Sequence, residues 1–238
     1  MENINVAVAT DANYCQHAAV TLASLLHNNR RLSFRVFIAV TEPLGAAGAL
    51  ISATVSQFGN ATVEFVDFSQ DLLPNLHLSH HISLASYVRL WLTTRLPADV
   101  GRLLYLDSDV VVCSDISSLW GVDLEGNYLA AVPDLPYSHE NIGFANDDRY
   151  FNAGILIIDV QKWVRENLAQ QLVNYALSKG SQLTYWDQDV LNACCKNRVL
   201  FLDLKWNFQA MMAERPGCFA LNPSEFKNPP CESRYHTL

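Results

Sequence analysis

The sequence has few charged residues and is poorest in cations. Only 17% of its 238 residues are charged, and 16 lysines and arginines stand against 24 aspartates and glutamates, which gives a formal net charge of −8. A protein that binds nucleic acid through its phosphates needs the opposite balance, so this composition argues against nucleic acid as a partner. One small anion held by local cations or a metal ion remains compatible with it.

The sequence also lacks the segments that direct a chain into or across a membrane. Residues 1–9 contain neither a basic leader region nor a small-residue cleavage site, and no apolar run approaches the roughly 20 residues that span a bilayer. The six cysteines form no CxxC pair. We expect Cys15, Cys113 and one of Cys194 or Cys195 to be buried, reduced thiols, which favours the cytoplasm.

No internal repeat and no Pro/Gly/Ser-rich linker divides the chain, so we expect one domain with a full hydrophobic core. Strand and helix patterns alternate along it. The alternation predicts an α/β fold whose sheet is parallel in the first half and mixed in the second, with helices on both faces. Strands are expected at 4–9, 34–40, 62–68, 102–106, 110–112, 129–132, 154–158 and 199–202, and helices at 14–27, 44–58, 83–92, 160–178 and 187–196.

Polar residues follow two of these predicted strands directly. Thr10-Asp11-Ala12-Asn13 comes after the first strand, and Asp107-Ser108-Asp109 comes after the strand at 102–106. In doubly wound sheets the ligand lies beyond the carboxyl ends of the strands. We therefore expect both segments to line one ligand site.

The triplet Asp107-Ser108-Asp109 interrupts two apolar runs with two carboxylates. Two carboxylates at the end of a core strand cost several kcal/mol unless cations or hydrogen bonds compensate them. In a tight turn the two can converge on a hard divalent cation such as Mn²⁺ or Mg²⁺. Both aspartates are also compatible with a turn in which they bind backbone amides, and Asp11 with a helix cap.

Five ordered segments carry a resemblance to a known family. They are residues 8–14, 81–90, 104–109, 150–155 and 185–192, read as VATDANY, HISLASYVRL, LYLDSD, YFNAGI and YWDQDVLN. The chain resembles the family-8 retaining glycosyltransferases over about residues 4–210. That group contains bacterial lipopolysaccharide and lipooligosaccharide galactosyl- and glucosyltransferases and glycogenin.

The resemblance implies a GT-A fold, with a nucleotide-binding half at 1–112, a donor-sugar and acceptor half at 113–212 and an irregular segment at 213–238. It further implies a UDP-sugar donor, a saccharide or lipid-linked saccharide acceptor, and Mn²⁺ or Mg²⁺ as cofactor. By position it assigns Ala9, Asp11, Asn13, Asp107, Ser108 and Asp109 to the nucleotide; Arg89, Asp134, Asn152, Ala153, Gly154, Asp187 and Gln188 to the donor sugar; His81 and Tyr185 to the acceptor; and Asp107, Asp109 and His236 to the metal.

The resemblance also implies retention of configuration at the anomeric carbon, with Asp187 and Gln188 at the reacting sugar. A double displacement needs a carboxylate nucleophile, and the amide of Gln188 is a poor one. We therefore expect transfer on the front face, with the leaving phosphate helping to deprotonate the acceptor.

The C-terminal segment departs from the family pattern. Relatives carry a later HxGxxKPW-like segment, whereas this sequence ends in Ser233-Arg234-Tyr235-His236-Thr237-Leu238. The expectation is that residues 213–238 are incomplete and that a tail for peripheral membrane docking is missing. Weaker donor binding and slower turnover than in a longer relative would follow.

Two other functions fit parts of the sequence. An apolar strand before Asp107-Ser108-Asp109 also resembles the first motif of haloacid dehalogenase-type phosphatases, which would need a later acidic pair such as Asp147-Asp148. Alternatively, the protein binds a nucleotide sugar without transferring it. Release of phosphate, release of UDP, or UDP binding alone distinguishes the three.

Overall fold

A seven-stranded sheet forms the centre of the part of the chain that the computed structural model describes, residues 3–70, 84–134, 140–145 and 147–209. The strands lie in the order β3-β2-β1-β4-β6-β5-β7. Their bounds are β1 Ile4–Thr10, β2 Phe34–Val40, β3 Ala61–Asp67, β4 Arg102–Leu106, β5 Leu129–Pro133, β6 Phe151–Asp159 and β7 Val199–Phe201. The helices are α1 Cys15–Asn28, α2 Ala46–Ser56, α3 Leu84–Val88, α4 Ser117–Trp120, α5 Val160–Arg165, α6 Leu168–Lys179 and α7 Trp186–Cys195, with short 3₁₀ turns at Leu92–Thr94, Glu140–Ile142, Gly180–Gln182 and Leu204–Trp206.

Strand direction changes in the middle of the sheet, which confirms the predicted α/β architecture. Strands β1, β2, β3 and β4 run parallel, whereas β6 runs antiparallel to both β4 and β5. Because β6 is antiparallel to β4, its first residues lie beside the carboxyl end of β4, with Ile155 paired to Leu106. This reversal brings a segment from the second half of the chain to the edge where β1 and β4 end.

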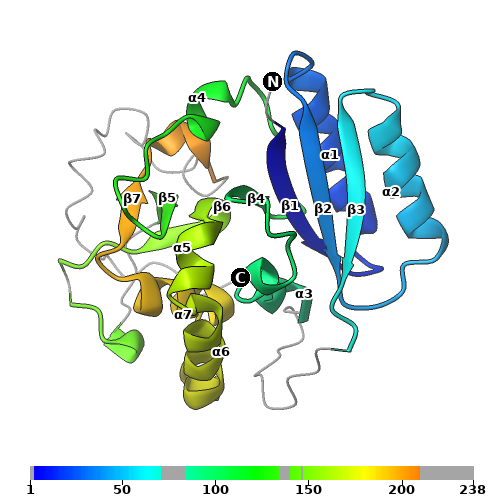
Figure 1. Ribbon diagram of the computed structural model, residues 1–238. Helices are drawn as coiled ribbons and strands as arrows, with labels where there is room; N and C mark the ends of the chain where they lie inside the picture. Colours follow the sequence, from blue (N-terminus) through cyan, green and yellow to red (C-terminus); the bar gives the residue numbers. More distant parts are fainter. Residues whose placement is uncertain (1–2, 71–83, 135–139, 146, 210–238) are drawn as a thin grey trace, which may run out of the picture.

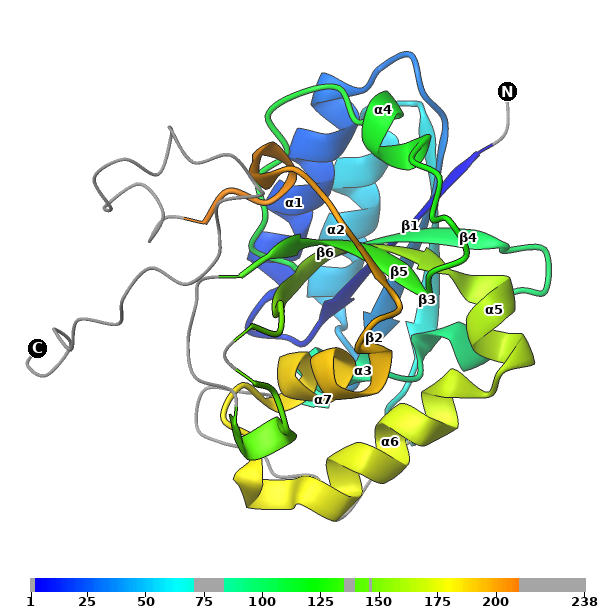
Figure 2. The same cartoon turned by 90° about the vertical axis from the view of Figure 1, so that its left-hand side faces the viewer.

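Two layers of helices cover the sheet (Figures 1 and 2). Helices α1 and α2 pack on one face, and α3, α5, α6 and α7 lie against the other. Side chains alternate along a strand, so Val6 and Val8 join the core beneath α1 and α2, while Ala7 and Ala9 face the core beneath α3. The small side chains of Ala7 and Ala9 leave room for α3 to approach the sheet closely.

The segment after Asp109 differs from the predicted strand at 110–112, which is irregular. Side chains of α1 satisfy its backbone groups in place of a neighbouring strand. Thr21 Oγ1 donates to the Ser108 carbonyl at 2.8 Å, Ser24 Oγ accepts from the Val112 amide at 2.9 Å, and Asn28 Nδ2 donates to the Val112 carbonyl at 2.8 Å. Helix α1 therefore fixes the backbone on both sides of Asp109.

Three other local predictions are wrong in detail. The helix expected at 160–178 is broken into α5 and α6 at Asn167, which adopts a left-handed backbone (φ 51°) that asparagine tolerates better than most residues. The helix expected at 83–92 is only α3, so Arg89 lies in the turn after it. Cys113 is exposed rather than buried, whereas Cys15 and Cys195 are buried free thiols as expected.

Candidate active site

A cavity of about 520 Å³ opens where β1 and β4 end. Its walls come from the loop after β1, from α3, from the end of β4, from the start of β6 and from the start of α7. The lining residues are Ala9, Thr10, Asp11, Asn13, Tyr14, Ala85, Ser86, Arg89, Tyr105, Asp107, Ser108, Asp109, Ala153, Tyr185, Trp186, Asp187 and Gln188. The two polar segments predicted to share one site, at 10–13 and 107–109, do so.

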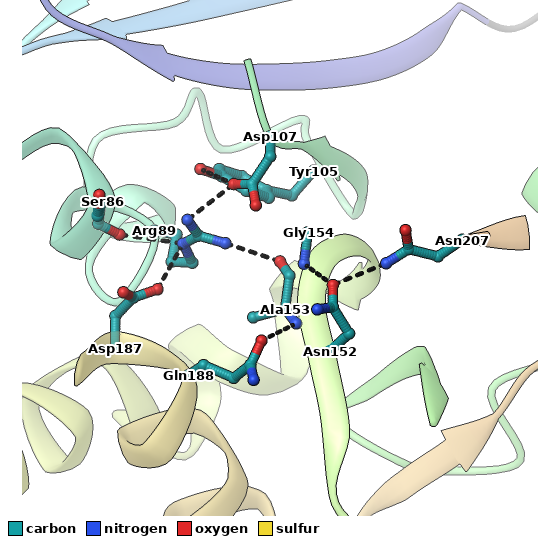
Figure 3. A network of polar contacts seen from close by, with 10 residues as sticks. All are labelled: Ser86, Arg89, Tyr105, Asp107, Asn152, Ala153, Gly154, Asp187, Gln188 and Asn207. Carbon is teal, nitrogen blue, oxygen red and sulfur yellow. Dashed lines mark hydrogen bonds and ion pairs between the residues drawn. The ribbon is translucent and has the colours of Figure 1, made fainter. Parts of the chain in front are cut away.

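Arg89 is the central cation of this cavity, and only 7% of its surface is exposed (Figure 3). Its guanidinium pairs with Asp107 Oδ1 at 2.7 Å and with Asp187 Oδ2 at 2.8 Å. It also donates to the carbonyls of Ser86 at 3.0 Å and Ala153 at 2.7 Å. One side chain thereby joins α3, β4, β6 and α7.

The charges of this cluster shift one another's ionisation. Burial alone would lower the pKa of Arg89, but the carboxylates of Asp107 and Asp187 outweigh it and raise that pKa. Burial raises the pKa of Asp187 to about 6, although Arg89 opposes the shift and Asp107 adds to it. The pKa of Asp107 is also raised, by burial against the opposing effect of Arg89 and with help from the charge of Asp109. Arg89 is therefore shared by Asp107 and Asp187, and it neutralises their combined charge only in part.

Asp107 and Asp109 both line this cavity. The side chain of Asp107 is 32% exposed, and Oδ1 is the oxygen that meets Arg89 and, at 3.4 Å, Tyr105 Oη. Asp109 is exposed, and its charge is close enough to act on the ionisation of Asp107. Two hard oxygen donors with excess negative charge suit a divalent cation. Within the described ranges no third histidine, cysteine or carboxylate completes a group of three ligands.

Hydrogen bonds of two side-chain amides support the cavity wall formed by β6 and α7. Gln188 Oε1 accepts from the Ala153 amide at 2.9 Å, and its Nε2 donates to Asp134 Oδ2 at 2.8 Å. Asn152 Oδ1 accepts from the Gly154 amide at 2.8 Å. Gln188 and Ala153 line the cavity, whereas Asp134, Asn152 and Gly154 lie behind them. The structure thus brings together residues that are far apart in the sequence.

Asp11 lines the cavity directly after β1. Its Oδ1 accepts from the amides of Asn13 at 3.0 Å and Tyr14 at 3.1 Å in the turn before α1, whereas the helix cap considered as the alternative for Asp11 is the residue Tyr14. The side chain of Asp11 also lines the cavity, so shaping the loop and facing a ligand are compatible roles. Ala9 and Asn13 line the cavity beside it.

Tyr185 lines the cavity, but His81 and His236 lie outside the described residues. Sequence reasoning missed Ser86, Tyr105 and Trp186, which line the cavity as well. Tyr105 could have been found, because it stands two residues before Asp107 along a strand, where side chains share a face. The ring of Tyr105 packs under Arg89, 4.7 Å from the guanidinium carbon.

Gly154 lies so close to the side chains of Asp107 and Asn152 that a larger residue would collide with them. A Cβ at this position would lie 3.0 Å from both Asp107 Oδ2 and Asn152 Oδ1. Gly154→Ala is expected to lower the free energy of unfolding by about 1–3 kcal/mol and to displace Asp107. Chemical denaturation measures the first effect and titration with Mn²⁺ the second.

Gly101→Ala is the matched control, because its added Cβ meets the mobile end of Gln161 at 3.1 Å, away from the cavity. It should leave metal affinity unchanged. Equal metal affinity in both variants and wild type would contradict the role assigned to Gly154.

A mostly parallel sheet that turns antiparallel at β6, with acidic residues after β4, is the GT-A fold of glycosyltransferases. The chain belongs to glycosyl transferase family 8, whose sequence profile matches residues 5–228. This confirms the family and the fold class predicted from the five segments.

Individual relatives and solved structures agree with this assignment. The chain is 31% identical over 211 residues to lipopolysaccharide 1,2-glucosyltransferase of Escherichia coli K12, covering 87% of this chain and 62% of that protein. It is 28% identical over 214 residues to a putative glycosyltransferase of Haemophilus influenzae, covering 87% and 64%. The chain therefore spans less than two thirds of the length of either relative.

Among solved structures, galactosyltransferase LgtC in complex with donor and acceptor sugar analogs superposes with a TM-score of 0.79. It is 28% identical, over 92% of this chain and 79% of that one. As for membranes, the described part of the chain contains no helix with the length and apolar character needed to span a bilayer.

Proposed function

We propose that this protein is a retaining hexosyltransferase that moves galactose or glucose from a UDP-sugar to a saccharide or lipid-linked saccharide acceptor. The synthesis of lipopolysaccharide or another surface glycan is the proposed setting, in line with relatives named as lipopolysaccharide glucosyl- and galactosyltransferases. The observation that carries the proposal is one cavity lined by Asp107, Asp109, Arg89, Asp187 and Gln188.

The position of each wall supports a division of the cavity between nucleotide and sugar. Ala9, Asp11 and Asn13 would hold the uridine, because they line the cavity at the carboxyl end of β1, where ligands of such sheets lie. Ser108 would contribute from the neighbouring turn, where its carbonyl is fixed by Thr21. The donor sugar would lie against Arg89, Ala153, Asp187 and Gln188, and Asp134, Asn152 and Gly154 behind them would hold that wall in place. Residues 1–112 and 113–212 would thus supply the nucleotide and sugar halves.

We propose that Asp107 and Asp109 hold Mn²⁺ or Mg²⁺. Such an ion would neutralise charge that develops on the diphosphate as the glycosidic bond breaks. Both aspartates line the same cavity in the turn after β4, which fits this role. Arg89 would keep Asp107 ionised and oriented toward the cavity.

A panel of UDP-sugars tests the proposed function. We expect UDP release from UDP-galactose or UDP-glucose in the presence of Mn²⁺, loss of that release on chelation with EDTA, and recovery when Mn²⁺ is restored. Thermal stabilisation by UDP and Mn²⁺ without any UDP release would favour a binding protein that does not transfer. Release that EDTA leaves unchanged would remove the metal from the proposal.

The stereochemistry of the product tests the front-face mechanism. The side chain of Gln188 is held between the Ala153 amide and Asp134, so its amide presents no carboxylate nucleophile. We therefore expect the product to keep the anomeric configuration of the donor, as read by NMR. An inverted product would count against this mechanism.

The phosphatase alternative gains no support from the site. Asp147 and Asp148, the acidic pair it requires, do not line the cavity, and Asp148 pairs with Lys196. The cytoplasm remains our proposed compartment, supported by the buried free thiols of Cys15 and Cys195. Peripheral association with the inner face of the membrane stays a prediction.

A further inference from the structure

Four consecutive residues, Tyr185, Trp186, Asp187 and Gln188, all line the cavity. A regular helix turns by about 100° per residue, so four successive side chains point over most of a circle. Tyr185 precedes α7 and Trp186 is its first residue, so this segment borders the cavity at the N-terminus of the helix, where the backbone departs from regular helical geometry.

That departure lies at Trp186, the first residue of α7, which has a φ of 44°. The left-handed region is unfavourable for bulky side chains. The other three non-glycine residues with positive φ in the described chain are Glu125, Asn167 and Asn197, none of which lines the cavity. Among the residues that line the cavity, Trp186 is thus the non-glycine residue with a strained, positive-φ backbone.

Hydrogen bonds on both sides hold this strained conformation. Asp189 is fully buried, and its Oδ2 accepts from the amides of Thr184 at 2.8 Å and Tyr185 at 2.9 Å. The Gln188 amide donates back to the Tyr185 carbonyl at 2.9 Å. The backbone is therefore fixed before and after Trp186.

Trp186 borders both the protein core and the cavity. It is half-buried and packs against the core cluster under α3 and α7. Its neighbour Tyr185 is supported in turn by Tyr150, with ring centroids 6.4 Å apart. Two consecutive aromatic residues, Tyr185 and Trp186, therefore line the cavity directly before Asp187 and Gln188.

We propose that Trp186 is a specificity-determining residue whose indole packs against the apolar face of a pyranose ring. An aromatic face offers a pyranose contact area for its C–H groups, while Asp187 and Gln188 offer polar groups for its hydroxyls. The proposal rests on the function proposed above and adds a residue that none of its assignments includes. The ring is that of the donor hexose or of the acceptor saccharide, and the experiment separates the two.

The first test compares binding of UDP, UDP-galactose and UDP-glucose by calorimetry in Mn²⁺, together with the KM for the acceptor. Trp186→Asn removes the ring but keeps a residue that tolerates the left-handed backbone. We expect it to weaken UDP-hexose binding or to raise the acceptor KM by roughly tenfold, with UDP binding changed less than about twofold. Trp186→Phe should stay within about threefold of wild type.

A loss confined to UDP-hexose places the donor ring on Trp186, and a loss confined to the acceptor KM places the acceptor ring there. Tyr14→Asn is the control, because Tyr14 lines the nucleotide side and its loss should affect UDP and UDP-hexose equally. The proposal is overturned if Trp186→Asn weakens UDP as much as UDP-hexose, or changes nothing. Failure of the wild-type protein to release UDP would instead sink the proposed function, while the binding comparison would still report on Trp186.

The second test addresses the backbone. Trp186→Gly should unfold about 2–4 °C above Trp186→Ala, since glycine adopts positive φ without strain. Ala193→Gly in the same helix should lower the unfolding temperature, because alanine is favoured at an ordinary helical position. The same order of alanine over glycine at both positions would overturn the strained role of Trp186.

Discussion

Asp109→Asn is expected to slow metal-dependent UDP release by about 10²–10³-fold while leaving the fold intact. Asp109 is exposed and lines the cavity. Its backbone is already held by α1, through Thr21 on one side and Ser24 and Asn28 on the other. The substitution therefore removes a charge and changes little else.

Loss of that charge should weaken the binding of a hard divalent cation, because such cations favour carboxylate oxygen. In the wild-type protein, Mn²⁺ with UDP should raise the unfolding temperature, because a ligand that binds only the folded state stabilises it. The variant should lose most of that increase. Its free energy of unfolding without ligands should stay within about 0.5 kcal/mol of wild type.

Asp147→Asn is the matched control, since Asp147 is exposed and does not line the cavity. It should retain both UDP release and stabilisation by Mn²⁺. If Asp109→Asn keeps the wild-type rate while EDTA still abolishes it, the metal is held by other residues.

Arg89→Met is expected to lower the free energy of unfolding by about 3–5 kcal/mol and to abolish donor binding. The substitution keeps much of the side-chain volume but leaves two buried or half-buried carboxylates without their cation. It also leaves the carbonyls of Ser86 and Ala153 without a donor. Denaturant unfolding and calorimetry with UDP measure the two effects.

Arg165→Met is its control. Arg165 has a side chain 67% exposed, and it lies 3.6 Å from Glu166 at the surface. Exposed ion pairs contribute little to stability, so the free energy of unfolding should change by less than about 1 kcal/mol. Adding Asp187→Asn to Arg89→Met should recover part of the lost stability, because it removes one uncompensated charge. No recovery would show that Arg89 acts through packing rather than charge.

The loss of stability caused by Arg89→Met should also depend on pH. In the wild type the pKa of Asp187 is already raised by burial to about 6, and Arg89 opposes that shift. Without Arg89 the folded-state pKa rises further above its unfolded value. A raised carboxyl pKa contributes stability below the unfolded pKa and loses it as pH rises through the folded one. The difference in free energy of unfolding between wild type and variant should therefore be larger at pH 8 than at pH 5.

Local patterns in the sequence predicted much of this fold. Apolar runs at 4–9, 34–40 and 102–106 correspond to β1, β2 and β4, because strand alternation and burial leave a signal in neighbouring residues. The rule that ligands lie beyond the carboxyl ends of parallel strands placed Asp11 and Asp107 in one cavity. The five ordered segments supplied the family.

Other features had no local signal. The run at 110–112 has the apolar composition of a strand, but no strand lies beside it, and α1 binds its backbone instead. The break at Asn167 depends on a single backbone angle. Cys113 stands among apolar neighbours in the sequence and is nevertheless exposed.

The sequence by itself determined the order of strands and helices, the family and most of the residues that line the cavity. Only the tertiary structure decided how they combine. The antiparallel β6 sets Gly154 against Asp107, Arg89 bridges Asp107 and Asp187, and Trp186 adopts a left-handed backbone where it lines the cavity. These contacts join residues far apart in the chain or depend on one dihedral angle, and neither leaves a periodic pattern that a sequence can show.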